Sequence, residues 1–291
     1  MDYLVKIELR RGYYEHKFGS LALHPYVLPV VASDETEAIV KAHYLAMGMG
    51  LGQVVVRKVE PVDFCWSDER PGDQPWYKAK IGVFDLETTG LDVEKECPVE
   101  VGVLEYDLST KSFINPRTWL VCPDVPMGAK AQEVHGIGEE LWGAAPKLSE
   151  IGQEIADHLE SFDVLIAHND GYDVPLIRHS LARNGVHVRM PPTWCSMLLA
   201  INEIENGRLR RGKAKLEILS KDLGLELPEA HRAEHDARAA GNLFMHLARK
   251  SPDLQRGVTL NQACAHMLSL RMPSEKFCNL DLASQWKKEC L

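Results

Sequence analysis

The sequence predicts an α/β catalytic domain built on a mixed central sheet, together with a smaller α+β domain at the N-terminus. Apolar, strand-like runs alternate with helix-type patterns through the middle of the chain, as is typical of α/β proteins. Carboxylates follow at the ends of these runs, where a sheet can hold a site. The expected organisation is a small domain at 1–65, a linker at 66–78, a catalytic domain at 79–250 and a helical extension at 251–291.

Residues 1–65 carry strand patterns and one helix pattern. Apolar and charged residues alternate from Tyr3 to Leu9, which predicts a strand, and further strands are expected at 26–31 and 53–59. Asp34 is followed three positions later by Glu37, which resembles a capping box at the start of a helix that runs to about Met47. Four interpretations stay open for this domain: nucleic-acid binding, partner recruitment, dimerisation, or simple support of the catalytic domain.

The catalytic domain is expected to begin with a three-stranded meander at 80–87, 99–106 and 113–121. Residues two apart on a strand point to the same face, so Asp85 and Glu87 should project together from the end of the first strand. Gly90 predicts a turn, which would leave the backbone N–H groups of Thr88 and Thr89 near the site. Such donors suit a phosphate or sugar.

A fourth buried strand is expected at 163–167, followed by a turn at 168–171. Because proline is tolerated in the first turn of a helix, Pro175 predicts a helix that begins no more than a few residues before it, near Asp173. Asp173 would then lie beside a positive helix N-terminus, which favours its ionised form.

The last helix of the domain is predicted from about 233 to 249. Asp236 begins an apolar stripe on one face of this helix, which continues through Ala240 and Leu243. An aspartate in that position is costly unless it is paired or bound to a metal. His231 should lie in the preceding loop, free to approach a metal-bound water, and a histidine pKa near ~6.5 suits proton transfer at neutral pH. His235 is the competing candidate.

Four carboxylates in three segments cannot all stay ionised at close range without cations. Hard oxygen ligands favour Mg²⁺ or Mn²⁺, and two such ions roughly 3.5–4 Å apart can clamp the attacking and leaving oxygens of a phosphoryl displacement. The residues therefore predict a site for two divalent cations that serves phosphodiester hydrolysis. Its expected metal ligands are Asp85, Glu87, Asp173 and Asp236.

Taken in order, these segments resemble the motifs of the DEDDh group of 3′→5′ exonucleases, the superfamily of the proofreading subunits of bacterial replicative polymerases, exonuclease X and ribonuclease T. The resemblance covers about 80–250 and implies a ribonuclease-H-like fold. It extends to the segments between the motifs, at 121–126, 134–137, 192–196 and 215–225. Two departures stand in the second motif, where Asp170-Gly171 replaces small apolar residues and Tyr172 replaces the usual phenylalanine.

The resemblance implies a role for each matching position. Asp85, Glu87 and Asp236 would hold the metal that carries the nucleophilic water. Asp85 would bridge to a second metal that Asp173 supports, and His231 would be the general base. The positions that match the family's binding site for the 3′-terminal nucleotide are Thr88, Thr89, Gly90, Leu91, His135, Asn169 and Tyr172.

Composition is compatible with a cytoplasmic nuclease. The net charge is −9, of which two divalent ions would neutralise four charges. The sequence has a basic segment at 208–215, with Arg208, Arg210 and Arg211. This segment is expected either to contact the phosphate backbone of the nucleic-acid strand or to be a solvated loop. The seven cysteines form no C-x-x-C pair, and neither a signal-peptide h-region nor an apolar run of transmembrane length is found.

The predicted reaction is hydrolysis at the 3′ end of single-stranded nucleic acid, with DNA favoured, to release nucleoside 5′-monophosphates. One alternative is an exoribonuclease of the same group. The other is a binding protein that recruits a polymerase or another partner without turnover. The candidate contacts for a polymerase, another protein or a second copy of the chain are residues 1–65 and 251–291.

Overall fold

The structure is a computed structural model, and it describes residues 2–9, 26–31, 34–36, 38–39, 54–62, 74–209, 214–226, 231–254 and 258–270. Clustering of contacts divides the chain into two compact units, of which one contains the first three strands and the other comprises residues 65–267. Among the described residues, no helix has the length and apolar composition needed to cross a membrane. The domain boundaries expected from the sequence stay predictions.

The first unit contains a three-stranded antiparallel sheet. Its strands are β1 (Asp2–Leu9), β2 (Tyr26–Val31) and β3 (Val54–Val62), in the order β2-β1-β3. These are the strands expected from the alternating patterns, within one to three residues. Most of the predicted helix from 34 to 47 lies outside the described residues.

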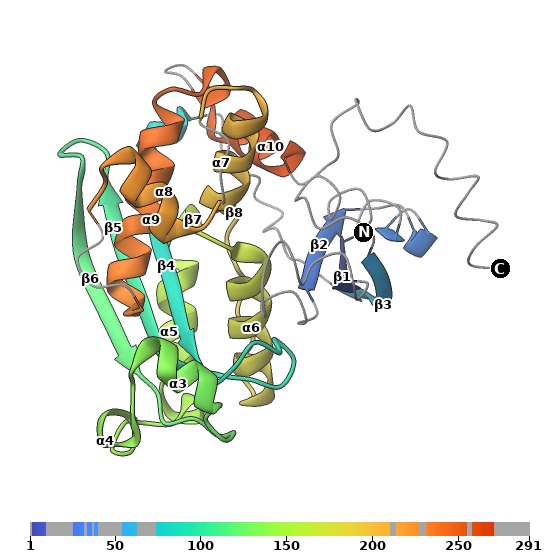
Figure 1. The fold of residues 1–291 in the computed structure, drawn as a ribbon, viewed down its shortest axis with the longest axis vertical. Coiled ribbons are helices and arrows are strands. Elements are labelled where there is room, and N and C mark those ends of the chain that lie inside the picture. The colour runs from blue at the N-terminus through green and yellow to red at the C-terminus, as the bar shows by residue number, and fades with distance from the viewer. Residues whose placement is uncertain are drawn as a thin grey trace. The chain divides into compact units, whose positions relative to one another are not determined.

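The second unit is built on a five-stranded mixed sheet with the order β6-β5-β4-β7-β8 (Figure 1). Strands β4 (Ile81–Thr88), β5 (Pro98–Asp107) and β6 (Ser112–Leu120) form the predicted antiparallel meander. Strands β7 (Val164–Ala167) and β8 (Thr193–Cys195) continue the sheet in parallel with β4. The fold is the predicted α/β architecture with a mixed sheet, although β8 was not expected as a strand.

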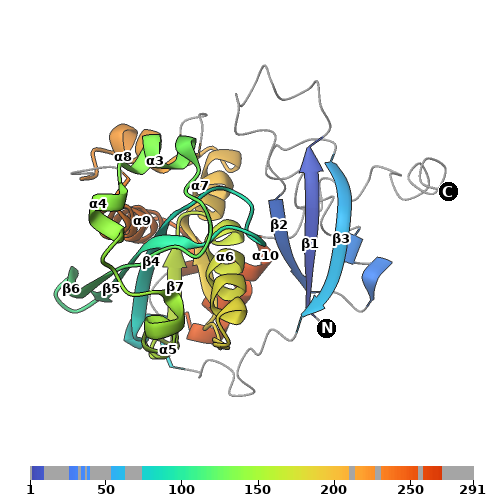
Figure 2. The same cartoon turned by 90° about the horizontal axis from the view of Figure 1, so that it is seen from below.

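Helices cover both faces of this sheet, with α9 on one side and α5 on the other (Figure 2). Trp119 on β6 donates its ring N–H to Glu154 of α5, while the neighbouring Thr118 contacts Glu234 of α9, as expected for the opposite faces of one strand. The helices are α3 (Ala129–His135), α4 (Glu139–Trp142), α5 (Leu148–Glu160), α6 (Asp170–Arg183), α7 (Ser196–Glu205), α8 (Leu216–Leu223), α9 (Ala233–Ala248) and α10 (Leu260–Ser269).

Helix α6 begins three residues earlier than the proline rule predicted. Asn169 is its N-cap, and the carbonyl of Asn169 accepts the N–H groups of Tyr172 and Asp173 at 2.8 and 3.2 Å. Pro175 therefore lies in the second turn, inside the helix. A proline there removes one backbone hydrogen bond, the one that would end on the Gly171 carbonyl, and buried packing compensates, since Val174, Pro175 and Leu176 are all buried.

An aromatic cluster ties residues from both ends of this unit to its core. Trp76, in the short 3₁₀ helix η2 (Trp76–Lys78), donates its ring N–H to the carbonyl of Leu254 at 3.1 Å. It meets Trp194 edge to face, and Trp194 stacks on Phe244 of α9. Part of the expected linker and the start of the C-terminal extension thus pack on this unit. The part of the expected helical extension that follows residue 270 lies outside the described residues.

Candidate active site

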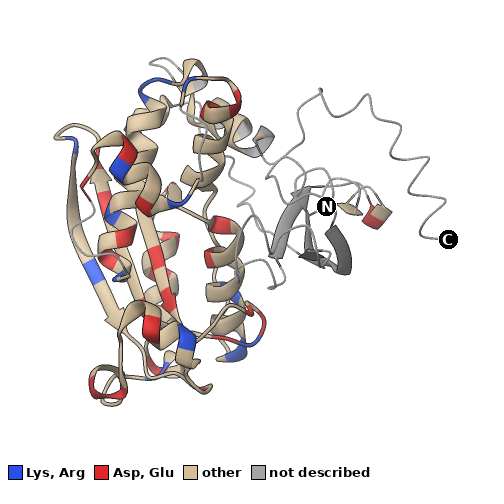
Figure 3. Cartoon of the chain, viewed as in Figure 1, with Lys and Arg blue, Asp and Glu red and all other residues tan. Residues whose placement is uncertain are grey.

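Strand β4 positions two carboxylates at the centre of the sheet. Asp85 is paired across the ladder with Gly102 of β5, and Glu87 with Glu100. The run Ile81–Phe84 is fully buried, which anchors the strand, while Asp85 is partly exposed and Glu87 is nearly buried. Figure 3 shows acidic positions in red on β4 and at the beginning of α6. As predicted from their spacing, Asp85 and Glu87 share one face of the strand.

Helix α9 brings a third carboxylate and a histidine to the same place. His231 lies in the turn before α9 with a left-handed backbone, φ +69°, and its N–H donates to Asp236 Oδ2 at 2.9 Å. One potential ligand atom from each of Glu87, His231 and Asp236 lies within 4.8 Å of the others. Among the described residues, this group contains His231 and not His235. The first and third predicted motifs, whose acids Glu87 and Asp236 are 149 positions apart in the sequence, therefore converge in space.

Asp173 completes the set from the first turn of α6, where it is buried. The sequence predicted that the helix N-terminus would favour its ionised form. Burial and the neighbouring charge of Asp170 instead raise the pKa of Asp173 well above its ordinary value of 3.8, and the backbone N–H groups oppose this only in part. Asp170 itself is buried and accepts a hydrogen bond from Thr193 at 2.7 Å. The departure from the family motif therefore adds a second carboxylate beside Asp173.

The pKa values of the other three acids are also raised. Burial first, and then the charge of Asp173, raises the pKa of Asp85 well above its usual range. Burial and then Asp236 raise the pKa of Glu87 to about 8. Burial raises the pKa of Asp236, against the lowering effect of the His231 N–H. Oxygen donors that cannot ionise together in the free protein fit a divalent cation, which would allow all of them to be charged.

Two further residues of this site were missed by sequence reasoning. Glu100 is fully buried on β5, and its carboxylate accepts two N–H groups of Arg232 and the backbone N–H of Ala233. A lone glutamate within the apolar run Val99–Leu104 was the available signal, because a buried charge requires a partner. Arg232, which follows His231 directly, is that partner.

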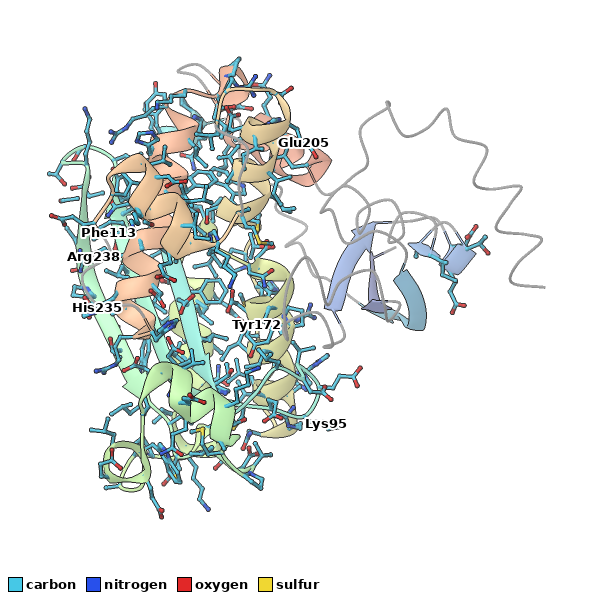
Figure 4. All side chains as sticks on the ribbon, in the orientation of Figure 1. Lys95, Phe113, Tyr172, Glu205, His235 and Arg238 are labelled. Carbon is cyan, nitrogen blue, oxygen red and sulfur yellow. The ribbon has the colours of Figure 1, made fainter. Side chains whose placement is uncertain are left out.

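The turn after β4 is closed by the hydroxyl of Tyr172. The Tyr172 hydroxyl donates to the carbonyl of Gly90 at 2.6 Å, and Thr88 Oγ1 lies 2.6 Å from that hydroxyl and 2.9 Å from the same carbonyl oxygen. Burial raises the pKa of the Tyr172 hydroxyl, so it stays protonated. Figure 4 shows the Tyr172 side chain between α6 and β4. Phenylalanine, usual in the family that the motif resembles, could not make these bonds.

The backbone N–H of Thr89, which was expected near the site as a donor suited to a phosphate or sugar, already has a partner within the protein. This N–H donates to the carbonyl of Cys97 at 3.0 Å, and the Thr89 carbonyl accepts the N–H of Gly128 at 2.9 Å. The hydroxyl donates to Glu96 at 2.5 Å and accepts from the N–H of Cys97. Thr89 is fully buried, because the chain from 89 to 97 folds back on itself, so its polar groups support the loop from inside.

The remaining predicted substrate positions are found on three elements around the site. His135 ends α3 and is buried, and its Nδ1 accepts the N–H of Ile137, so the ring proton lies on Nε2. Burial lowers the pKa of His135, which keeps its ring neutral. Asn169 caps α6, and Gly90 and Leu91 are partly exposed in the turn after β4.

The basic segment is described only at its two ends. Arg208 forms a bidentate ion pair with the buried Glu203 at the end of α7, with N···O distances of 2.5 and 2.7 Å. The Arg208 guanidinium therefore already has Glu203 as a structural partner, in addition to any contact with a nucleic-acid strand. Arg210 and Arg211 lie outside the described residues, so their predicted role stays a prediction.

His168 links the second motif to the far end of that segment. Its Nδ1 lies 2.9 Å from Ser196 Oγ, and its Nε2 lies 2.9 Å from the carbonyl of Ala214. A carbonyl can only accept, so Nε2 carries the proton and Nδ1 accepts from the serine. Burial lowers the pKa of His168 to about 4, which leaves it neutral in the folded protein at physiological pH.

This pKa predicts a pH dependence of stability that glutamine at position 168 would remove. The folded pKa is about 4 against an ordinary 6.5, so the unfolded chain takes up the proton first and stability falls as pH drops from 6.5 towards 4. Urea unfolding of the metal-free protein at pH 7.5 and at pH 5 should show the advantage of the wild type over His168→Gln shrinking by about 2 kcal/mol. An advantage that is equal at the two pH values would contradict a neutral, buried His168.

Residues 83–244, more than half of the chain, match the protein-family model described as Exonuclease (RNase_T). The epsilon subunit of DNA polymerase III from Treponema pallidum (strain Nichols) is 28% identical over 164 residues, which are 55% of this chain and 73% of that protein. The PolC-type DNA polymerase III of Clostridium perfringens (strain 13 / Type A) is 27% identical over 194 residues. Those residues are 66% of this chain and only 13% of that polymerase.

Solved structures share the fold. The zinc-bound complex of E. coli ExoI with single-stranded DNA superposes with a TM-score of 0.53 at 18% identity, over 60% of this chain and 42% of that chain. The nuclease domain of 3′hExo, described as a DEDDh family member bound to rAMP, gives a TM-score of 0.50 at 12% identity, over 62% of this chain and 97% of that chain. The second unit therefore has the ribonuclease-H-like exonuclease fold.

Proposed function

The chain belongs to the exonuclease family of nucleic-acid hydrolases, and from this membership we propose that it removes nucleotides from the 3′ end of single-stranded nucleic acid, with DNA favoured, as nucleoside 5′-monophosphates. The observation that carries the proposal is the convergence of Glu87, His231 and Asp236 within 4.8 Å, beside Asp85 of the same strand. All five predicted catalytic residues are present, so a catalytic role is favoured over recruitment without turnover.

The acids are proposed to hold two divalent cations, Mg²⁺ or Mn²⁺. The ligands would be Asp85, Glu87, Asp173 and Asp236, whose raised pKa values show how poorly they ionise together without positive charge. Bound cations would supply Lewis acidity towards the scissile phosphate and lower the pKa of a bound water. Oxygen donors of this kind favour Mg²⁺ and Mn²⁺ over softer metals.

His231 is proposed to take the proton from the attacking water. It is exposed in the turn before α9, and its backbone N–H is held by Asp236, so the ring is free to move while the backbone is fixed. The residues at the positions that match the family's nucleotide-binding site are proposed to receive the terminal nucleotide, among them Thr88, Gly90, Leu91, His135 and Asn169. Tyr172 would form the wall of this site with its ring while its hydroxyl holds the turn.

The similarity to polymerase III subunits supports, as a proposal, association with a polymerase through residues 1–65 or 251–291. A role in DNA repair, a homodimer and a cytoplasmic location stay predictions from the sequence.

The test is digestion of matched 5′-labelled single-stranded DNA and RNA with Mg²⁺, with Mn²⁺ or with EDTA. We expect a ladder that shortens from the 3′ end, requires the metal and is faster on DNA. A faster ladder on RNA would favour the exoribonuclease alternative. Products that shorten from the 5′ end, or no cleavage of either strand, would overturn the proposal and favour a recruitment role.

A further inference from the structure

The ion pair between the buried Glu100 and the partly exposed Arg232 lies beside the site without belonging to the predicted catalytic set. Arg232 Nε is 3.1 Å from both carboxylate oxygens of Glu100, and its Nη2 is 2.6 Å from Oε1. The carboxylate also accepts the backbone N–H of Ala233 at 2.9 Å. The Glu100 carboxylate is thus bound by the Arg232 guanidinium and by a backbone N–H in the first turn of α9. These charge-assisted hydrogen bonds are directional, so they fix the geometry of the pair.

The two members of the pair are adjacent to catalytic candidates on both sides. Glu100 faces Glu87 across the β4–β5 ladder. Arg232 stands directly between His231 and the first residue of α9, the helix that carries Asp236. The pair therefore joins the strand that supplies one carboxylate to the helix that supplies another.

Close packing at Gly102 reinforces this connection. A Cβ at Gly102 would lie 2.4 Å from the carbonyl carbon of Ala233 and 2.5 Å from the nitrogen of Glu234, distances that real Cβ atoms essentially never show. The first turn of α9 thus rests directly on the backbone of β5, two residues from Glu100 and opposite Asp85. Any side chain at 102 would push the helix away from the sheet.

We propose that Glu100 and Arg232 are positioning residues, which fix the N-terminus of α9 so that His231 and Asp236 converge on Glu87. The inference rests on the proposed function, since it concerns the same site. It predicts that the fork geometry of Arg232 matters and not its charge alone. Arg232 could act as a positioning residue or only as a nearby positive charge. Experiment can separate these two roles, because its loss would weaken metal binding in the first case and tighten it in the second.

Mn²⁺ binding to the full-length protein, measured by electron paramagnetic resonance without nucleic acid, is the first readout. If Arg232 acted only as a nearby positive charge, Arg232→Met would tighten the binding of a cation. If it positions Asp236 and His231, Arg232→Met should weaken Mn²⁺ binding roughly 10–100-fold, as is usual when the residues that orient metal ligands are lost. Arg232→Lys keeps the charge but loses the bidentate fork, so it should also weaken binding.

Two further variants test the position of the helix without changing Glu100 or Arg232. Gly102→Ala keeps Glu100 and Arg232 but displaces the helix, and should weaken Mn²⁺ binding in the same direction. Arg238→Met is the matched control, since Arg238 lies on the same helix, pairs with Glu234 and covers Phe113 on the far edge (Figure 4). This variant should bind Mn²⁺ like the wild type. Circular dichroism melts of every variant identify any that do not fold.

Strand cleavage supplies the second readout. In Arg232→Met and Gly102→Ala, kcat should fall about 10²-fold with KM little changed, because the catalytic groups move and the nucleotide contacts do not. Tighter or unchanged Mn²⁺ binding in folded Arg232→Met, or wild-type behaviour of Arg232→Lys, overturns the inference while leaving the exonuclease proposal intact. A wild type that binds Mn²⁺ but cleaves no strand overturns the exonuclease proposal, and the weakened Mn²⁺ binding then supports positioning alone. A wild type that binds no Mn²⁺ overturns both.

Discussion

Asp85→Ala is expected to abolish metal-dependent cleavage, with a loss on the order of 10³-fold or more. After burial, the largest contribution to the raised pKa of Asp85 is the charge of Asp173, whereas for the pKa of Glu87 it is the charge of Asp236. Among the neighbouring charges, Asp85 therefore interacts most strongly with the acid on α6, and Glu87 with the acid on α9. Loss of this ligand would remove Lewis-acid stabilisation worth several kcal/mol, and each 1.36 kcal/mol is about tenfold in rate.

The same substitution should make the metal-free protein more stable at neutral pH. A carboxyl whose folded pKa is raised costs stability wherever the unfolded chain is ionised. For Glu87, with a folded pKa of about 8 and an ordinary value of 4.5, the cost grows as pH rises from 4.5 to 8. The same holds for Asp85, whose pKa is raised by burial and by the charges of Asp173 and Glu87, so its removal relieves that cost. The melting midpoint in EDTA should rise by about 2–4 °C for each kcal/mol relieved.

Labelled-strand digestion and thermal melts in EDTA, run on the same preparations, check both parts of this prediction. Asp157→Asn is the matched control, since Asp157 is an exposed acid on α5 whose carboxylate contacts Gln153. It should cleave like the wild type and show no stabilisation in EDTA. Wild-type turnover in Asp85→Ala would exclude Asp85 from the metal site. An unchanged melting midpoint in EDTA would show that the acids do not repel one another as their raised pKa values imply.

Patterns local to one strand or helix were sufficient to predict much of this fold. The apolar run before Asp85 predicted a buried strand, and the apolar stripe that follows Asp236 predicted a helix. Each pattern lies within a single element, and both elements were found where expected. The start of α6 was misplaced, because Pro175 carries a strong local rule that tertiary packing overrides. Thr89 was misjudged for a similar reason, since its partners lie in a loop that returns to it.

The pair of Glu100 and Arg232 shows what local patterns cannot supply. Its members are 132 positions apart, and neither forms part of a recognisable spacing. A glutamate in a buried strand shows that a partner is needed but not which of many cations provides it. The pairing depends on how α9 crosses β5, which in turn depends on the small residue at Gly102. Contacts of this kind are decided by the assembled sheet and helix together.

Removal of the His231 side chain is expected to slow cleavage 10²–10⁴-fold, as loss of a general base. The choice of replacement matters, because His231 has φ +69°, a conformation that costs most residues energy but suits asparagine and glycine. His231→Asn should keep the turn and the N–H donated to Asp236 while removing the base. His231→Ala, like the wild-type histidine, would hold a residue with a Cβ in this conformation, at a cost on the order of 1 kcal/mol. Because both variants lack the base, both should lose kcat with KM little changed.

His235→Ala provides the matched control, since His235 lies four residues away in the first turn of α9 and outside the group formed by Glu87, His231 and Asp236. Single-turnover cleavage with saturating Mg²⁺ measures the chemical step in all three variants. If His231→Asn cleaves like the wild type while His235→Ala loses 10²-fold or more, the base is His235 and the exposed turn before α9 serves only to place Asp236. If His231→Asn and His231→Ala are slow while His235→Ala cleaves like the wild type, His231 is the base, and the hydrogen bond from its N–H to Asp236 couples the base to a proposed metal ligand.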